Sequence, residues 1–439
     1  MLIPKSILYA MSIATCKATK LYVSSYDGNI TTMHVTEHKA VGIYNQSQIE
    51  LKPIAINNGC APSPSWLQLH SNTLFCADEG NTTPNKSLLV SFKTGPNGTL
   101  LPLSKLTTLN GNVNSAIYGN GSTMALAEYS GSAITTVNLK NTSALTILQS
   151  LNFIFDFDTT RPGPKPQQSV PRPHQILFDP TEMFMLCPDL GADIIRVFHA
   201  HPANKILTEQ KPIKVSPGSG PRHATFYTSE ECGAKKTYLY LVTEISNSLL
   251  GYEVFYKNMT LSFNKIHESS TFGSHFIPVD SAASEILVTP NNKHLIISSR
   301  NDTYFLNSTN PDPANKTSIV SDTLLTYSIN PCNGSIALTQ KYPAGGSFPR
   351  SMSLNRKGDL LAVALQQSSR VVMFRRNATS GNITEIAGSV AVNGELTDVV
   401  WDEPTDDGVY ARALGVISFP RDSPVREGAI AIHTDILNR

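Results

Sequence analysis

The hydrophobic positions of this chain recur in one arrangement: a short apolar strand, a polar break and a second apolar strand. The arrangement occurs about seven times, at intervals of about 50–65 residues. Short apolar runs bounded by turn-forming residues are typical of β-strands that are buried on both faces. The paired runs are 21–23 with 32–35, 74–76 with 88–92, 124–126 with 134–137, 183–186 with 194–198, 238–242 with 249–255, 294–297 with 324–327, and 360–363 with 371–374.

A strand-built repeat of this size predicts an all-β fold, a seven-bladed β-propeller in which each repeat is one antiparallel sheet. A single blade cannot bury both of its faces, so the blades must stack around a common axis. We expect residues 19–439 to form a single propeller, because seven blades use nearly all of the chain. Two late apolar segments, 415–419 and 428–432, are the candidate strands that close the ring.

Charge and composition restrict the partners of the chain. Its 439 residues carry a formal net charge of +1 and contain no basic run, which argues against a nucleic-acid partner. No interior stretch has the ~18 uninterrupted apolar residues of a membrane span. The 28 prolines and 27 glycines lie mainly between the strand runs, which indicates many turns and little helix.

The N-terminus and the glycosylation sequons indicate a secreted protein. Lys5 precedes an apolar segment at 7–14, and Cys16 and Ala18 supply small residues for a cleavage site, so residues 1–18 are predicted to be a secretory signal peptide. Sequons are about twice as frequent as composition alone gives, and we expect glycans and a location outside the cell or in the cell wall. The alternative is a loop composition rich in Asn, Ser and Thr without glycans. The sequons begin at Asn29, Asn45, Asn81, Asn85, Asn97, Asn120, Asn141, Asn258, Asn301, Asn307, Asn315, Asn333, Asn377 and Asn382.

Loss of the signal peptide would leave five cysteines, an odd number. Cys60 and Cys76 fall in neighbouring strands of one repeat and are the predicted disulfide, whereas Cys187 follows an apolar run and is predicted to be a buried thiol. The pairing of Cys232 and Cys332 stays open. The sequence contains no Cys-x-x-Cys or His-x-x-x-His pair, so we expect neither a structural zinc site nor a cofactor.

Charged and imidazole side chains occupy equivalent positions in successive repeats. An earlier strand of each repeat carries Trp66, His174, His223, Glu285 or Arg350 at one position, and a second position holds Tyr26, Asp78 or Glu79, Glu128, Asp189, Glu244, Arg300 and Gln366. Equivalent positions of a propeller form a ring, so these groups should surround one channel mouth. Structural ion pairs between blades are the simpler explanation for any single member. The cluster of His174, Arg222, His223, Glu244 and Arg300 favours a site that holds an anion and moves a proton.

Several motifs resemble the seven-bladed lactonase family, which includes bacterial 6-phosphogluconolactonase and fungal carboxymuconate cyclase. They are Arg-Pro-His at 172–174, Phe-Asp-Pro at 178–180, Pro-Asp-Leu-Gly-Ala-Asp at 188–193, Gly-Pro-Arg-His at 220–223 and Phe-Pro-Arg at 348–350. The resemblance covers most of the chain from about residue 21 to residue 374. The chain differs from the family at Glu285, where a His is common, and in an expanded loop from 301 to 323.

The resemblance implies a catalytic set of His174, Arg222, Glu244 and Arg300. Further substrate contacts would come from His223, Asp189, Glu285 and Arg350. The expected partner is a small anionic lactone, or an organic acid that can form one. In hydrolysis Glu244 would deprotonate water, His174 would protonate the leaving oxygen, and the arginines would bind the anion. A cyclase would use the same groups without water. The alternative from a different class is a non-catalytic glycoprotein propeller that acts as an adhesin or binding module.

Overall fold

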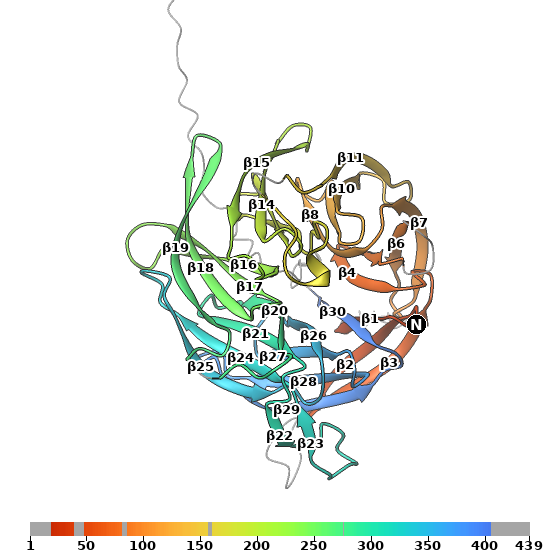
Figure 1. The fold of residues 1–439 in the computed structure, drawn as a ribbon. Coiled ribbons are helices and arrows are strands. Elements are labelled where there is room, and N and C mark those ends of the chain that lie inside the picture. Colours follow the sequence, from red (N-terminus) through yellow and green to blue (C-terminus); the bar gives the residue numbers. More distant parts are fainter. Residues whose placement is uncertain (1–18, 39–47, 81–85, 157–159, 275, 405–439) are drawn as a thin grey trace, which may run out of the picture.

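The computed structural model describes residues 19–38, 48–80, 86–156, 160–274 and 276–404. Within these ranges the chain forms seven four-stranded antiparallel sheets arranged around an axis, as Figure 1 shows, so the predicted all-β propeller of seven blades is confirmed. The only helical element in these ranges is one 3-10 turn at Pro166–Gln168, and none of it has the length and hydropathy of a membrane span.

Each blade runs from an inner strand at the axis to an outer strand at the rim. The inner strands are β30 (Leu396–Asp402), β4 (Pro64–His70), β8 (Asn112–Tyr118), β12 (Leu177–Phe178), β16 (Pro221–Ser229), β20 (Ala282–Val288) and β26 (Pro349–Leu354). The second strands are β1 (Lys20–Ser25), β5 (Thr73–Asp78), β9 (Thr123–Glu128), β13 (Phe184–Asp189), β17 (Lys236–Thr243), β21 (His294–Arg300) and β27 (Leu360–Leu365).

The third strands are β2 (Ile30–His38), β6 (Ser87–Thr94), β10 (Ala133–Asn138), β14 (Ile194–Ala200), β18 (Ser248–Lys257), β24 (Thr323–Ile329) and β28 (Arg370–Arg376). The outer strands are β3 (Gln48–Asn57), β7 (Leu100–Thr108), β11 (Thr146–Asn152), β15 (Leu207–Lys214), β19 (Thr260–Ser270), β25 (Ile336–Pro343) and β29 (Ile383–Ala391).

Differences in burial explain why the sequence reveals only two of the four strands of each blade as apolar runs. The second strands lie between neighbouring blades and are buried at nearly every position, as in β5 and β9. Their side chains on both faces therefore enter the apolar clusters between blades. Outer strands such as β19 alternate between exposed and half-buried positions, because one face meets water. The recurring apolar pair in the sequence corresponds to the second and third strands.

The ring closes within one blade that combines both ends of the described chain. Strand β30 pairs with β1 in antiparallel register, and Lys20 Nζ lies 3.2 Å from Asp402 Oδ2 across the closure. The hydroxyl of Tyr22 donates to the same carboxylate oxygen at 3.0 Å. The expected closing segments, 415–419 and 428–432, lie outside the described residues, and β30 closes the ring in their place.

Side chains join the inner strands of neighbouring blades to one another. Asn114 Oδ1 accepts the backbone N–H of Ile176 at 2.9 Å, and Gln175 Oε1 accepts that of Ala224 at 2.7 Å. At the closing blade Asp398 Oδ2 accepts the N–H of Leu67 at 2.8 Å. Inner strands have no further strand on their axial side, so these bonds satisfy amides that would otherwise be buried without a partner. They also fix the positions of the side chains that face the axis.

The cysteines form two disulfides in the described part of the chain. The predicted pair Cys60–Cys76 is confirmed, and a second bond joins Cys232 to Cys332, a pairing that the sequence left open. Cys187 is a buried free thiol, as predicted. The second disulfide connects the loop between β16 and β17 to the loop between β24 and β25 in the neighbouring blade.

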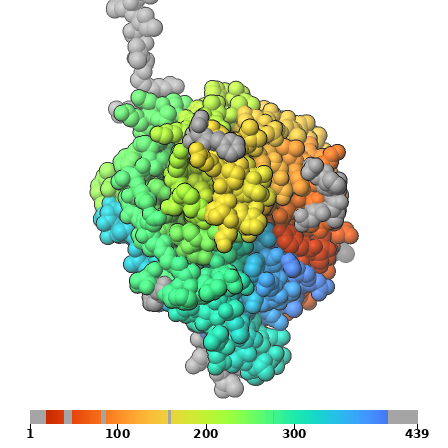
Figure 2. All heavy atoms as spheres, in the orientation of Figure 1, coloured from red at the N-terminus to blue at the C-terminus, as the bar shows by residue number. Residues whose placement is uncertain are grey.

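The expanded loop from 301 to 323 forms a small lobe at the rim. It contains a two-stranded sheet of β22 (Phe305–Ser308) and β23 (Ile319–Ser321), and it projects from the edge of the molecule in Figure 2. Its Asp312 carboxylate lies 3.3 Å from the Arg370 guanidinium on β28, and Ser389 Oγ donates to Pro311 O at 2.6 Å. The lobe is therefore fastened to the next blade.

Candidate functional site

One residue in each of six blades occupies the same place at the end of the second strand. The backbone N–H of this residue donates to a carbonyl just before the inner strand, as from Glu79 to Ser63 at 2.9 Å and from Glu244 to Gly220 at 2.8 Å. We call this set the mouth ring. Its members are Tyr26, Glu79, Tyr129, Leu190, Glu244 and Gln366.

The residue directly before the mouth ring is a buried acid in three consecutive blades. Asp78 accepts the N–H of Ser63 at 2.8 Å, and Glu128 accepts that of Leu109 at 2.9 Å. Asp189 accepts backbone amides in the same way and also pairs with the Arg196 guanidinium at 2.9 Å. These acids fasten the loops that enter the inner strands, and none of the three lines the axial cavity.

Glu244 therefore lies one position further along than Glu128 and Asp189, although the sequence comparison had placed the three together. Because side chains alternate along a strand, an offset of one residue turns a side chain to the opposite side. The side chain of Glu244 is 22% exposed, whereas that of Asp189 is 0% exposed. The structure therefore brings Glu244 to the mouth and keeps Asp189, a predicted substrate contact, away from it.

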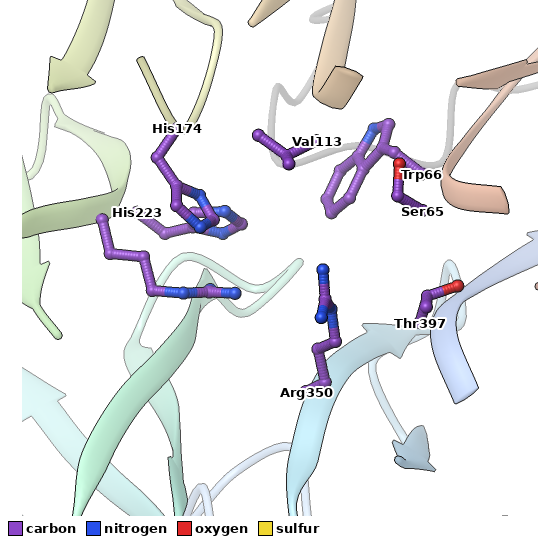
Figure 3. Close-up of a pocket in the computed structure, with 8 residues that line it drawn as sticks. Ser65, Trp66, Val113, His174, His223, Arg350 and Thr397 are labelled. Carbon is purple, nitrogen blue, oxygen red and sulfur yellow. The ribbon is translucent and has the colours of Figure 1, made fainter. Parts of the chain in front are cut away.

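A small cavity lies on the axis beneath the mouth. It has a volume of about 10 Å³, close to what one water molecule needs. Figure 3 shows His174 and His223 together on one side of the cavity, with Trp66 across from them and Arg350 reaching in from β26. The lining residues are Ser65, Trp66, Val113, His174, Arg222, His223, Arg350 and Thr397.

Arg222 reaches the cavity from the start of β16, where the backbone turns tightly. Gly220 has φ +64°, and a Cβ at this position would lie 2.8 Å from the side chain of Ile245. Pro221 then begins the strand, so Arg222 leaves the turn with its side chain buried at the axis. The Gly-Pro-Arg-His motif thus has a conformational basis, since the glycine allows the turn that precedes the arginine.

Two arginines hold the carboxylate of Glu244. Its Oε2 accepts from Arg222 Nε and lies the same 2.8 Å from the Arg300 guanidinium. Burial disfavours the charged form of Glu244, but the charges of Arg300 and Arg222 outweigh burial and lower its pKa. Arg300 also donates to two backbone carbonyls of β20 and stacks at 5.1 Å over the ring of Phe348. Arg300 does not line the cavity, so it acts by holding Glu244.

The two histidines form a neutral pair at the bottom of the site. Their rings lie 5.1 Å apart, and the ring of Tyr129 lies 5.6 Å from that of His174. Burial, followed by the charge of Arg222, lowers the pKa of His174 well below its usual value. Burial also lowers the pKa of His223, against the opposing effect of Glu285. Nδ1 of His174 and Nε2 of His223 are buried without a hydrogen-bond partner in the described structure.

Glu285 takes part in the site indirectly. It lies in β20 with both carboxylate oxygens 3.0 Å from Nδ1 of His223. This contact fixes the orientation of the His223 ring and leaves Nε2 directed away from the carboxylate. Glu285 does not line the cavity, so the structure supports a positioning role in place of the predicted substrate contact.

A second ionic group lies at the mouth, built from the first, second and seventh blades. The Arg350 guanidinium is 5.0 Å from the centroid of the Tyr26 ring and 3.8 Å from Glu79 Oε2, and the Tyr26 hydroxyl donates to the same oxygen. The sequence predicts Tyr26 and either Asp78 or Glu79 on the ring without a role, and the structure places Glu79 there. Tyr129 was missed altogether, although its place after the apolar run of β9 matches that of Glu79 after β5.

The described residues include no group of three or more His, Cys, Asp or Glu side chains placed to hold a metal ion. The charged groups around the axis are the guanidiniums of Arg222, Arg300 and Arg350 and the carboxylates of Glu79, Glu244 and Glu285. Of these groups, Arg222 and Arg350 line the cavity, beside the imidazoles of His174 and His223. This combination suits a small organic anion, because guanidinium groups bind carboxylates and phosphates with directed hydrogen bonds.

Comparison with known proteins agrees with the sequence motifs. The model of the family described as "Lactonase, 7-bladed beta-propeller" matches residues 20–401. The chain belongs to this lactonase family. A relative from Arthroderma benhamiae, named a probable 6-phosphogluconolactonase, is 29% identical over 335 residues, 76% of this chain and 78% of the relative. The 6-phosphogluconolactonase of Formosa agariphila is 28% identical over 233 residues, 52% of this chain and 58% of that protein.

A solved structure with lower sequence identity to this chain has the same fold. The periplasmic gluconolactonase of Pseudomonas aeruginosa superposes with a TM-score of 0.69 at 19% identity, over 87% of this lactonase-family chain and 98% of its own. The resemblance that the sequence motifs suggested is therefore confirmed at the level of family and fold.

Proposed function

We propose that this lactonase-family protein hydrolyses an anionic sugar lactone at the axial mouth. The observation that carries the proposal is the convergence of His174 and Arg222 on one cavity at the axis, with the Glu244 carboxylate held behind Arg222. Family membership and the names of its relatives support lactone chemistry. The cavity lining contains two guanidinium groups, Arg222 and Arg350, and no carboxylate among the described residues, which supports a negatively charged substrate.

His174 is the better candidate for the proton-accepting group. Glu244 Oε2 is occupied by the guanidinium groups of Arg222 and Arg300, and Glu244 does not line the cavity. His174 is neutral, lines the cavity and has an unpaired ring nitrogen. Burial, followed by the charge of Arg222, lowers the pKa of His174. A substrate anion would offset part of the Arg222 charge, which raises the basicity of His174 when substrate binds.

In the proposed reaction His174 takes a proton from water while the water oxygen bonds to the lactone carbonyl carbon. Arg222 stabilises the negative charge that develops on the carbonyl oxygen. The bond from the carbonyl carbon to the ring oxygen then breaks, and the ring oxygen receives the proton from His174 to give a hydroxy acid. The small cavity has room for the attacking water, so the sugar ring would lie in the mouth above it.

The test is proton release measured by pH-stat on glucono-δ-lactone and 6-phosphoglucono-δ-lactone, corrected for spontaneous hydrolysis. We expect His174→Gln to lower kcat by about 10²- to 10⁴-fold. His267→Gln is the matched control, because His267 lies on outer strand β19 and contacts Ser269. Wild-type protein that does not exceed the spontaneous rate would refute lactone hydrolysis. The candidates would then be carboxymuconate-type cyclisation and ligand binding without catalysis.

We also propose that the protein is a secreted glycoprotein. Every sequon asparagine in the described ranges is exposed or partly exposed, including Asn97, Asn258 and Asn333, where a glycan would not disturb the core. Two disulfides also favour an oxidising compartment. Treatment of protein from the medium of its expressing host with an endoglycosidase should lower its mass by several kilodaltons. An unchanged mass would refute glycosylation.

A further inference from the structure

The mouth carries two carboxylate–guanidinium units on different blades. In the first, Glu244 is held at 2.8 Å by both Arg222 and Arg300. In the second, Glu79 occupies the equivalent mouth-ring position three blades earlier and faces Arg350 at 3.8 Å. Both units lie at one mouth, but they differ in how firmly the charges are paired.

The first unit is held in place by hydrogen bonds from both of its arginines. Arg222 donates to Glu244 and to the carbonyl of Ser284, and Arg300 donates to two carbonyls besides its contact with Glu244. These bonds hold the unit rigidly at the axis. The remaining N–H groups of Arg222 can polarise a carbonyl oxygen beside His174. A separate phosphate or carboxylate would have to compete with Glu244 for both arginines.

The second unit is more loosely paired. A separation of 3.8 Å between Arg350 and Glu79 is longer than a hydrogen bond, and the Tyr26 hydroxyl already donates to the same oxygen of Glu79. The Arg350 guanidinium lines the axial cavity and keeps 16% of its side-chain surface exposed at the mouth. Burying a cation in this position is favourable only if an anion accompanies it. Glu79 supplies that anion without a direct hydrogen bond to Arg350.

We infer that Arg350 is the specificity-determining residue that binds the remote anionic group of the substrate, with Glu79 as the internal carboxylate that this group displaces. The inference rests on the proposed function and adds the orientation of the substrate in the site. The lactone carbonyl lies between His174 and Arg222, and the phosphate or carboxylate of the same molecule lies against Arg350. Tyr26 holds Glu79 when the site is free and supports the Arg350 guanidinium from its ring face.

Two substitutions should shift the preference for charged substrate in opposite directions. Arg350→Gln should lower kcat/KM for 6-phosphoglucono-δ-lactone about 10- to 100-fold, mainly through KM, and should lower kcat/KM for glucono-δ-lactone by a clearly smaller factor. Glu79→Gln removes the competing charge and should lower KM for the phosphorylated lactone. Arg350→Lys keeps the charge and should retain part of the preference. Arg375→Gln, at the far end of β28, is the matched control and should leave both substrates unaffected.

Equal losses on both lactones in Arg350→Gln, or no loss on the phosphorylated one, would overturn the inference. Calorimetric binding of 6-phosphogluconate and gluconate provides a test that does not need turnover. If wild-type protein hydrolyses neither lactone, the proposed function fails, but the inference predicts that 6-phosphogluconate still binds more tightly than gluconate. Arg350→Gln should abolish that difference, and wild-type protein that binds both acids equally would refute the role of Arg350.

Discussion

Glu128 is one of the buried acids that hold the loops before the inner strands, and its titration tests whether these acids have a structural role. Its side chain is fully buried, Oε1 accepts the N–H of Leu109 at 2.9 Å, and Oε2 accepts the hydroxyl of Thr135 at 2.8 Å. Burial raises the pKa of Glu128 to about 7 from its ordinary value of 4.5, because these two bonds compensate only part of the lost hydration.

A raised pKa of an acid means that the folded state binds the proton more tightly than the unfolded state. The stabilisation of the fold by protonated Glu128 is therefore fully present below the unfolded pKa of 4.5 and is lost as the pH rises to about 7. Each pKa unit corresponds to about 1.4 kcal/mol, so this one group lowers the free energy of unfolding by about 3 kcal/mol across that range. Between pH 5 and pH 8 the loss amounts to about 2–3 kcal/mol.

Glu128→Gln removes this loss and keeps the shape of the side chain. The amide oxygen can accept from Leu109, and the amide nitrogen can donate to Thr135, whose hydroxyl also lies 3.3 Å from Ser150 Oγ. The free energy of unfolding in urea should be measured for both proteins at pH 5 and pH 8. The difference between variant and wild type should be about 2–3 kcal/mol more favourable to the variant at pH 8 than at pH 5. The matched variant Glu268→Gln, at an exposed position, should follow the wild-type profile. If Glu128→Gln also runs parallel to wild type, the burial argument is wrong.

Three further predictions concern the site and its surroundings. The lowered pKa of His174 predicts that kcat/KM on neutral glucono-δ-lactone stays level from pH 8 to below pH 6, and a limb near about 6.5 would contradict it. Asp189→Ala leaves Arg196 buried with one fewer partner and should lower stability by about 3 kcal/mol in urea unfolding, with KM unchanged in the folded fraction. Arg300→Gln should lower kcat/KM about tenfold on charged and neutral lactones alike, because it acts through Glu244.

Much of the architecture could be predicted from the sequence because the second strand of each blade is buried on both faces. A strand in that position carries a central apolar run, as in β1 and β21, and the repetition of this run gives the blade number. His174, Arg222, His223 and Arg350 could be predicted to converge for a related reason. Arg222 and Arg350 lie at the same place, the register shift after the first residue of an inner strand, and His223 directly follows Arg222. The ring brings the starts of the inner strands together at the axis.

The parts that could not be predicted depend on single-residue offsets and on polar inner strands. The sequence aligned Glu244 with Asp189 because both are acids that end an apolar run. Only the backbone hydrogen bond from Glu244 to Gly220 reveals the offset. The closing strand β30 was missed because it carries Thr397 and Asp398, which face the axis and neighbouring blades and interrupt its apolar pattern.

The closure between β1 and β30 has a consequence for biosynthesis. Lys20 and Asp402, which meet in this blade, are 382 residues apart in the chain. At a translation rate of about 5–20 residues per second, β1 is made roughly 20–80 s before its partner. During this interval one blade has an unpaired inner edge, and the axial cavity lacks Thr397. The ring therefore closes only after residues 396–402 have been made, and a nascent chain interrupted before residue 396 would carry every predicted catalytic residue and still have an open ring.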